Sequence, residues 1–125
     1  QTLPYPGFPT DLQPVFCALA TQAHGTTLVE EYLYEGRFRY IEELKKMGAN
    51  ATIVDAHRVF ITGPTPFYGR EVTSHDLRSG AALLVASMFA SETTKIQNIM
   101  QIDRGYEKIE ERLQKVGADI KRIQK

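Results

Sequence analysis

The chain of 125 residues has no tryptophan, one cysteine and no long apolar run. The single Cys17 excludes an internal disulfide and a cysteine-rich zinc site, so we expect a reducing, cytoplasmic setting. No apolar stretch approaches the roughly 20 residues that span a bilayer. The N-terminus also lacks a basic region followed by an apolar one. We therefore expect neither a membrane segment nor a secretory signal, and the start at Gln1 hints at a piece of a longer protein.

Positive charge is absent from the first part of the chain. Residues 1–36 hold four acidic residues and no Lys or Arg, whereas residues 104–125 hold seven Lys or Arg and four Asp or Glu. The totals are 15 of each sign, which gives a formal net charge of zero. A nucleic-acid binder needs a basic face, so the balance argues against a nucleic-acid partner. The basic end is either a solvated helix face or a site for an anionic ligand.

Short motifs recur in the same order in the two halves of the chain. Asp11-Leu12-Gln13 is matched by Asp76-Leu77-Arg78, and Met47-Gly48-Ala49 by Val116-Gly117-Ala118. We interpret this as an internal duplication, residues 11–63 and 76–123, within a single unit that comprises residues 1–125.

Each repeat is predicted to form a helix, a strand, a helix and a strand. Thr10 and Gln13 have the spacing of a capping box for the first helix. The expected helices are Leu12–His24, Phe38–Met47, Asp76–Ala90 and Arg104–Val116. The expected strands are Thr26–Tyr32, Ala51–Val54, Val59–Thr62, Glu71–Ser74, Thr93–Asn98 and Ala118–Ile123.

The predicted helices are of two kinds. The segments 12–24 and 79–91 contain no charged residue, which is typical of helices buried on all sides. The other two are amphipathic, with Ile41 and Leu44 facing inward in one and a buried stripe of Tyr106, Ile109, Leu113 and Val116 in the other. Central helices surrounded by sheets would satisfy both kinds, although two repeats alone would leave part of the central helices uncovered.

Three arginines stand at or just before expected helix starts: Arg37, Arg78 and Arg104. A helix N-terminus carries partial positive charge, so a cation there is locally unfavourable and points to an anion site. Alternatively, each arginine pairs with a neighbouring acid: Arg37 with Glu35, Arg78 with Asp76, and Arg104 with Asp103.

Asp11 is the candidate carboxylate. It follows the Pro6-Gly7-Phe8-Pro9-Thr10 segment, whose proline and glycine residues fix the direction of approach. Asp11 is either a positioned proton acceptor or a first-turn acid that interacts with the helix dipole. The three histidines have no metal-ligand spacing, and Cys17 lies on an apolar helix face typical of a core residue. We expect no metal and no cofactor.

Several of these motifs resemble one family. Five segments occur in this order and spacing: Pro4-Tyr5-Pro6-Gly7-Phe8-Pro9-Thr10-Asp11-Leu12-Gln13, Gly36-Arg37-Phe38, Glu43 to Ala49, Asp76-Leu77-Arg78 and Ile102-Asp103-Arg104-Gly105-Tyr106-Glu107. Their order and spacing resemble those of the UDP-N-acetylglucosamine enolpyruvyl transferases (1-carboxyvinyltransferases). The resemblance covers nearly the whole chain. It implies an α/β fold, a partial inside-out α/β barrel with about two of the three βαβαββ repeats of one lobe.

The resemblance also implies an activity. The family transfers enolpyruvate from phosphoenolpyruvate to the 3-hydroxyl of UDP-N-acetylglucosamine, in the first committed step of bacterial peptidoglycan synthesis. Asp11 matches the carboxylate that takes the hydroxyl proton, Leu33 and Tyr34 match the segment beside the sugar, and Arg104 matches an arginine that binds phosphoenolpyruvate. Arg37 and Arg78 match active-site arginines, and Asp76 matches their acidic neighbour.

The family's catalytic loop cysteine, the target of fosfomycin, belongs to the other lobe, and Cys17 does not match it. We therefore expect the isolated chain to be inactive. The alternative function is a non-catalytic α/β interaction module or degenerate half-enzyme, whose uncharged helices a partner or a second copy of the chain would cover.

Overall fold

An antiparallel sheet packed on a helix forms the first half of the fold. The computed structural model describes residues 1–34 and 36–123. Strands β1 (Gly25–Glu30), β2 (Asn50–Asp55) and β3 (Arg58–Gly63) form a sheet in the order β1-β3-β2. Alternate residues of β3 face the core: Val59 and Ile61 are fully buried, whereas Phe60 between them is exposed. The predicted hairpin is confirmed, with Ile53 paired to Val59 across it.

Helix α2 (Arg39–Met47) supplies the apolar stripe that covers this sheet. Ile41 and Leu44 are buried, as predicted from their spacing. Gly48 ends the helix with φ 125°, a conformation in which any other residue would be strained.

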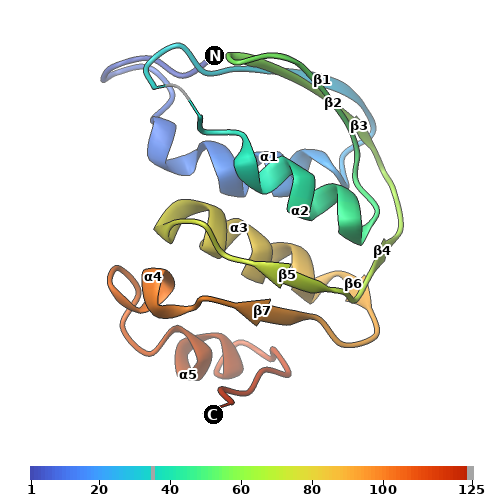
Figure 1. Cartoon of the computed structure of the whole chain (residues 1–125), viewed down its shortest axis with the longest axis vertical. Coiled ribbons are helices and arrows are strands. Elements are labelled where there is room, and N and C mark those ends of the chain that lie inside the picture. Colours follow the sequence, from blue (N-terminus) through green and yellow to red (C-terminus); the bar gives the residue numbers. More distant parts are fainter. Residues whose placement is uncertain (35, 124–125) are drawn as a thin grey trace.

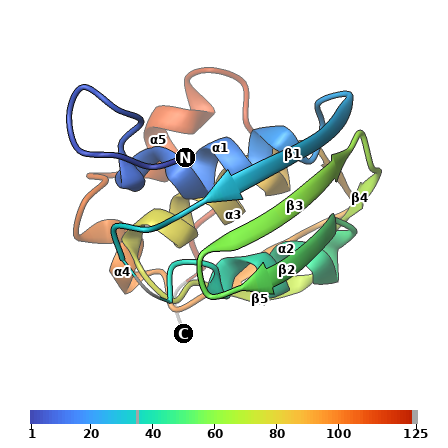
Figure 2. The same cartoon turned by 90° about the horizontal axis from the view of Figure 1, so that it is seen from above.

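Two further helices form the centre of the molecule. After the 3₁₀ turn η1 (Thr10–Leu12) comes α1 (Gln13–Ala20), which packs beside α3 (Leu77–Met88). Figure 2 shows the three-stranded sheet lying across these helices. Cys17 and Ala18 of α1 and Ala82 and Leu83 of α3 are fully buried. Small side chains such as those of Ala18 and Ala82 allow two packed helices to approach closely.

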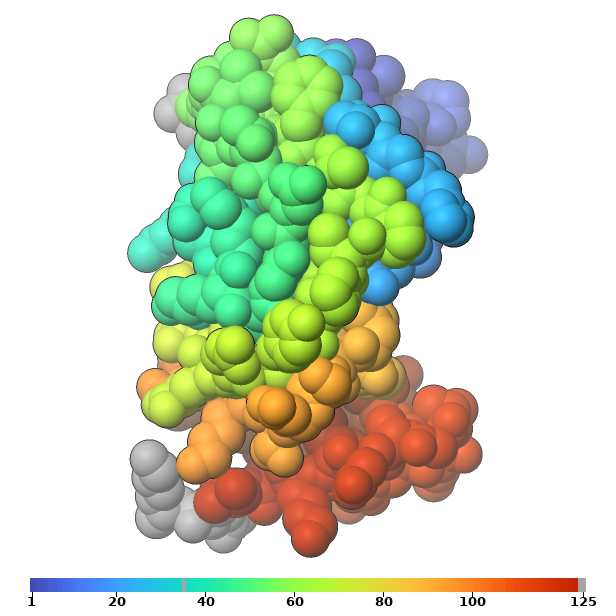
Figure 3. Space-filling view, turned by 90° about the vertical axis from the view of Figure 1, so that its right-hand side faces the viewer, coloured from blue at the N-terminus to red at the C-terminus, as the bar shows by residue number. Residues whose placement is uncertain are grey.

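The second half contains shorter elements. Strands β4 (Phe67–Tyr68) and β5 (Glu71–Thr73) pair in parallel with β6 (Ala90–Ser91) and β7 (Lys95–Gln97), and the short helices α4 (Met100–Asp103) and α5 (Ile109–Gln114) follow. Figure 1 places α5 at the end of the molecule opposite the three-stranded sheet. In Figure 3 the hairpin, the β4–β5 segment, the β6–β7 segment and the C-terminal part follow one another down one side. No helix in the described part of the chain is long and apolar enough to cross a membrane.

Three structural expectations for residues 104–123 are wrong. The predicted helix Arg104–Val116 is interrupted, because the chain turns after α4 and Lys108 adopts a left-handed conformation with φ 47°. The stripe of Tyr106, Ile109, Leu113 and Val116 is not buried, and Val116 is 79% exposed, since α5 lies at the edge of the fold. Residues 118–123 form no strand, because the described residues provide no neighbouring strand to pair with them.

The uncharged helices are buried only in part. Their outward faces are open, as the count of two repeats predicted. Val15 lines an apolar groove of about 370 Å³ together with six other apolar residues: Phe8, Leu12, Phe16, Leu19, Val85 and Phe89. Leu12 of η1 and Leu19 of α1 in this groove are 53% and 60% exposed, so one face of this segment is open to solvent.

Candidate functional site

Asp11 and Arg78 meet although they lie 67 residues apart in the chain. Asp11 lies in η1, and Arg78 lies in the first turn of α3. Arg78 Nε donates a hydrogen bond of 2.5 Å to Asp11 Oδ1. The packing of α1 against α3 brings together the two helix starts that carry these side chains. The carboxylate also offsets the unfavourable position of the Arg78 cation at the helix N-terminus.

Arg37 is the second cation at this carboxylate. Its Nη1 lies 4.0 Å from Asp11 Oδ1, and its side chain is only 19% exposed. The guanidinium stacks on the Tyr34 ring at 4.2 Å from the ring centroid. Nη1 is buried and has no hydrogen-bond partner among the described residues. A buried guanidinium N–H without a partner is costly, so this atom is suited to an anionic or hydroxyl ligand.

Asp76 caps a helix and does not form the ion pair with Arg78 that was considered as an alternative. It is the N-cap of α3. Ser79 N donates a hydrogen bond of 2.9 Å to Asp76 Oδ1, and Asp76 N donates one of 3.2 Å to Ser79 Oγ. This reciprocal capping fixes the start of the helix, and therefore the base from which Arg78 extends. The alternative pairing of Arg78 with Asp76 is wrong, because Asp76 accepts from the backbone instead.

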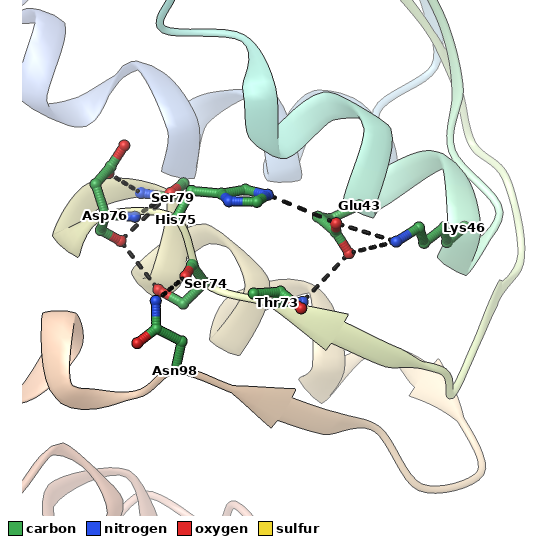
Figure 4. Close-up of polar contacts among 8 residues, drawn as sticks. All are labelled: Glu43, Lys46, Thr73, Ser74, His75, Asp76, Ser79 and Asn98. Atoms are coloured by element: carbon green, nitrogen blue, oxygen red, sulfur yellow. Dashed lines mark hydrogen bonds and ion pairs between the residues drawn. The ribbon is translucent and has the colours of Figure 1, made fainter.

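A polar cluster joins α2 to the segment that leads into α3 (Figure 4). Glu43, 6% exposed, accepts hydrogen bonds from Lys46 Nζ at 3.1 Å and from Thr73 N at 3.2 Å. His75 Nε2 lies 3.6 Å from the same carboxylate. On the other side of the segment, Asn98 Nδ2 donates 3.0 Å to Ser74 O. Residues 73–75 are thus held between α2 and the end of β7.

Arg104 lies at the same end of α3 as Arg78 but is not in contact with Asp11. It is the exposed C-cap of α4, not part of a helix N-terminus as expected. The next residue, Gly105, packs so closely on Leu77 that an added Cβ would lie 2.5 Å from a Leu77 methyl group. The alternative pairing of Arg104 with Asp103 is also wrong: Asp103 binds Arg122 at 2.8 Å, and Arg104 is in no ion pair between described residues.

Leu33 and Tyr34 follow β1 and are partly exposed, at 38% and 52%. Tyr34 supports the guanidinium of Arg37. Leu33 N donates 3.3 Å to Glu31 Oε2. Glu35, the acid considered as a partner of Arg37, is outside the described residues.

Glu31 is a site residue that the sequence analysis missed. Its side chain is fully buried and accepts hydrogen bonds from Thr2 Oγ1 at 2.5 Å, Gln13 Nε2 at 3.2 Å and Thr10 Oγ1. Burial raises the pKa of Glu31, but the hydrogen bonds from Thr10, Thr2, Gln13 and the Leu33 amide outweigh it and hold the pKa below its usual value. Thr10 and Gln13 do not form the predicted capping box, because both side chains turn toward this carboxylate.

Cys17 is buried next to this network, as expected of a core residue. Gln13 Oε1 accepts hydrogen bonds from Tyr40 OH and, at 3.8 Å, from Cys17 Sγ. Burial raises the pKa of Cys17 to about 12, although the hydrogen bond with Tyr40 acts in the opposite direction. A thiol with this pKa is protonated at neutral pH and is not a nucleophile.

The fold and this group of residues define the class. Residues 1–113 match the family described as EPSP synthase (3-phosphoshikimate 1-carboxyvinyltransferase), and the chain belongs to this family. The enolpyruvyl transferase NikO from Streptomyces tendae superposes with a TM-score of 0.85 and 33% identity, over 92% of this chain and 27% of that one. An EPSP synthase from Acinetobacter baumannii superposes with a TM-score of 0.79 at 22% identity, which supports the fold. The predicted enolpyruvyl-transferase fold is confirmed.

Within the family, the curated relatives with high sequence similarity are named UDP-N-acetylglucosamine 1-carboxyvinyltransferase, as the motifs predicted. The relative from Halothermothrix orenii is 51% identical over 98% of this chain, and that from Corynebacterium jeikeium is 42% identical over the whole chain. The chain spans 29% and 30% of their respective lengths.

Proposed function

We propose that this chain forms one wall of the active site of an enzyme that transfers enolpyruvate from phosphoenolpyruvate to the 3-hydroxyl of UDP-N-acetylglucosamine. The observation that carries the proposal is the convergence of Arg37 and Arg78, from two separate segments, on the exposed carboxylate of Asp11. The names of the relatives supply UDP-N-acetylglucosamine and the transferred 1-carboxyvinyl group, and the motif resemblance supplies phosphoenolpyruvate as the donor. The geometry supplies a carboxylate oriented by two cations. The reaction belongs to peptidoglycan synthesis, and the lone Cys17 suits a cytoplasmic location.

Asp11 is the proposed proton acceptor. The sugar 3-hydroxyl adds to C2 of phosphoenolpyruvate while C3 gains a proton. Loss of a proton from C3 and of phosphate from C2 then restores the carbon–carbon double bond of the enolpyruvyl product. Asp11 receives the hydroxyl proton as the C–O bond forms, and the fixed contact with Arg78 holds its other oxygen, Oδ2, in a defined direction. Because Asp11 is 67% exposed, a hydroxyl can reach it without rearrangement of the core.

The remaining residues bind the substrates. Leu33, through its backbone, and Tyr34 lie against the sugar, while Arg37 and Arg78 stabilise negative charge beside Asp11. Asp76 holds the start of α3 and thereby sets the position of Arg78. Arg104 binds phosphoenolpyruvate, and its exposed position at the turn after α4 leaves the guanidinium accessible.

The chain is also proposed to be one partial lobe with an internal duplication, residues 11–63 and 76–123. The paired packing of α1 and α3 supports this, because each helix begins at or just after the repeated Asp-Leu motif. The remainder of the relatives' length would supply the other lobe, so the isolated chain is expected to be inactive.

A full-length chimera tests the enzyme proposal. Residues 1–123 replace the matching part of the Halothermothrix orenii relative, and phosphate release is measured with both substrates. Asp11→Ala should lower kcat by about 10²–10⁴, the usual cost of removing a positioned base. Turnover of this variant equal to that of the unsubstituted chimera would refute the role of Asp11. Arg104→Ala should mainly raise the KM for phosphoenolpyruvate.

The apolar groove favours a second candidate, a non-catalytic interaction module or degenerate half-enzyme that self-associates or binds a partner through α1 and α3. An NMR titration of the isolated chain with UDP-N-acetylglucosamine distinguishes the two. Shifts at Asp11, Leu33 and Tyr34 support the enzyme wall. Their absence, together with an inactive chimera, supports the interaction module.

A further inference from the structure

The carboxylate of Glu31 lies between two segments of the proposed sugar site, the one that carries Asp11 and the one that carries Leu33. Glu31 Oε1 accepts from Thr10, the residue directly before Asp11, and from Gln13 in the first turn of α1. Glu31 Oε2 accepts from the amide of Leu33, the residue proposed to contact the sugar, and from Thr2. Each oxygen therefore serves a different segment, and the rigid carboxylate sets the spacing between them.

The backbone of Glu31 is itself anchored. Glu31 N donates 2.7 Å to His57 O in the β2–β3 turn, and His57 Nδ1 lies 2.9 Å from Glu31 O. The Tyr32 ring stacks on His57 with 5.1 Å between ring centroids. The backbone of Glu31 is thus held by the three-stranded sheet. This anchoring keeps the carboxylate in place independently of the segment at Leu33 that it supports.

The side chain cannot be replaced by an amide without loss. All the polar contacts of the Glu31 carboxylate in the described residues are with donors, namely two hydroxyls, one side-chain amide and one backbone amide. A glutamine would direct its own N–H groups at two of these donors and leave buried groups without acceptors. The site therefore requires an acceptor-only, ionised side chain in a fully buried position.

We propose that Glu31 is a positioning residue for the transfer reaction, which fixes the distance between Asp11 and the sugar-binding segment at Leu33. This inference rests on the proposed function. It adds a residue that does not touch substrate but controls how the proton acceptor meets the bound hydroxyl. Misplacement of reacting groups by about 1 Å can cost roughly 10²-fold in rate.

The test uses Glu31→Gln in the full-length chimera, with Thr21→Val as a control for the loss of a buried hydrogen bond. Thr21 is a fully buried polar residue at the C-terminal end of α1, where its hydroxyl donates a hydrogen bond of 2.6 Å to Ala18 O. We expect Glu31→Gln to lower kcat by about 10–100-fold and to raise the KM for UDP-N-acetylglucosamine, with the KM for phosphoenolpyruvate unchanged. Thr21→Val should lower the melting temperature and leave all three constants unchanged for the folded enzyme.

If Glu31→Gln does not fold, Thr10→Val supplies the second test. It removes one hydroxyl next to Asp11 and leaves the carboxylate in place, and it should lower kcat with little change in melting temperature.

The outcomes separate the inference from the proposed function. If kcat and both KM values of the folded Glu31→Gln enzyme equal those of the unsubstituted chimera, the inference is overturned while the proposed function stands. If Glu31→Gln does not fold, unchanged values in Thr10→Val have the same consequence. Equal effects of Glu31→Gln and Thr21→Val on kcat and on both KM values would do the same. An inactive unsubstituted chimera would overturn the proposed function itself, and the inference with it.

Discussion

Arg78 Nε and Asp11 Oδ1 are 2.5 Å apart, and the bond joins the first turn of α3 to η1, the 3₁₀ turn that leads into α1. Helical periodicity predicts each helix separately but carries no information on which starts will meet. The contact arises because the small residues of α1 and α3 allow the two helices to pack side by side.

Arg78→Lys in the full-length chimera should lower kcat/KM by about 10–100-fold. A lysine keeps the charge but lacks the planar guanidinium whose Nε reaches Asp11 from the side. Steady-state kinetics with both substrates measures the effect. Arg70→Lys is the control, because Arg70 contacts Tyr68 and the Gly69 carbonyl instead of Asp11. A loss of similar size in Arg70→Lys would indicate a general effect of arginine replacement.

Two isoleucines of the three-stranded sheet should differ strongly in their contribution to stability. Ile61 is fully buried, whereas Ile53 on the adjacent strand is 37% exposed. Ile61→Ala should lower the free energy of unfolding by about 2–5 kcal/mol, because it leaves a cavity in the core. Ile53→Ala should cost about 1 kcal/mol or less. Urea denaturation of the isolated chain checks both values, and equal losses would contradict the inward orientation of Ile61.

Glu31 should make stability depend on pH in the acidic range. Its pKa in the folded chain is below the ordinary value of 4.5 because four hydrogen bonds outweigh the effect of burial. The unfolded chain therefore binds a proton more readily, so the contribution of Glu31 is complete above pH 4.5 and is lost as the pH falls through the folded pKa.

The expected result is that the free energy of unfolding falls more steeply below pH 4.5 in the wild-type chain than in Glu31→Gln. Urea titrations at several pH values supply the slopes. Glu42→Gln, at an exposed position of α2, should retain the wild-type slope. Parallel curves for wild type and Glu31→Gln would show that this carboxylate does not titrate as the hydrogen bonds require.

The isolated chain should self-associate through the groove between α1 and α3. Leu19 in this groove is 60% exposed, and water contact with so many apolar side chains is unfavourable. Leu19→Lys should therefore shift the chain toward the monomer in sedimentation-velocity experiments over a range of concentrations. Val54→Lys, a comparable change at an exposed position of β2, should not. A strictly monomeric wild-type chain would rule out this mode of association.

Local patterns predicted the parts of the fold in which burial follows from one element and its neighbour. The stripe of Ile41 and Leu44 gave α2 correctly, and the turn between Ile53 and Val59 gave the hairpin. The predicted burial of the apolar stripe in residues 106–116 was wrong, because no further layer of the described chain covers this helix, and apolar residues at the same spacing then stay exposed.

The site was predictable only in part for a similar reason. Motifs selected Asp11, Arg37 and Arg78 as candidates, but their meeting depends on packing between distant helices. Glu31 was missed because an acidic residue after a strand is usually solvated. Its burial depends on Thr2, Thr10 and Gln13, which come from other segments.

The buried Cys17 provides an internal probe of local opening. Its thiol is inaccessible and protonated while α1 stays packed on its neighbours, so an alkylating reagent can modify it only when this region separates. The modification rate at known reagent concentration would thus report how often the layer beneath Asp11 and Glu31 opens. The chain allows this measurement without an added label, because it has a single thiol.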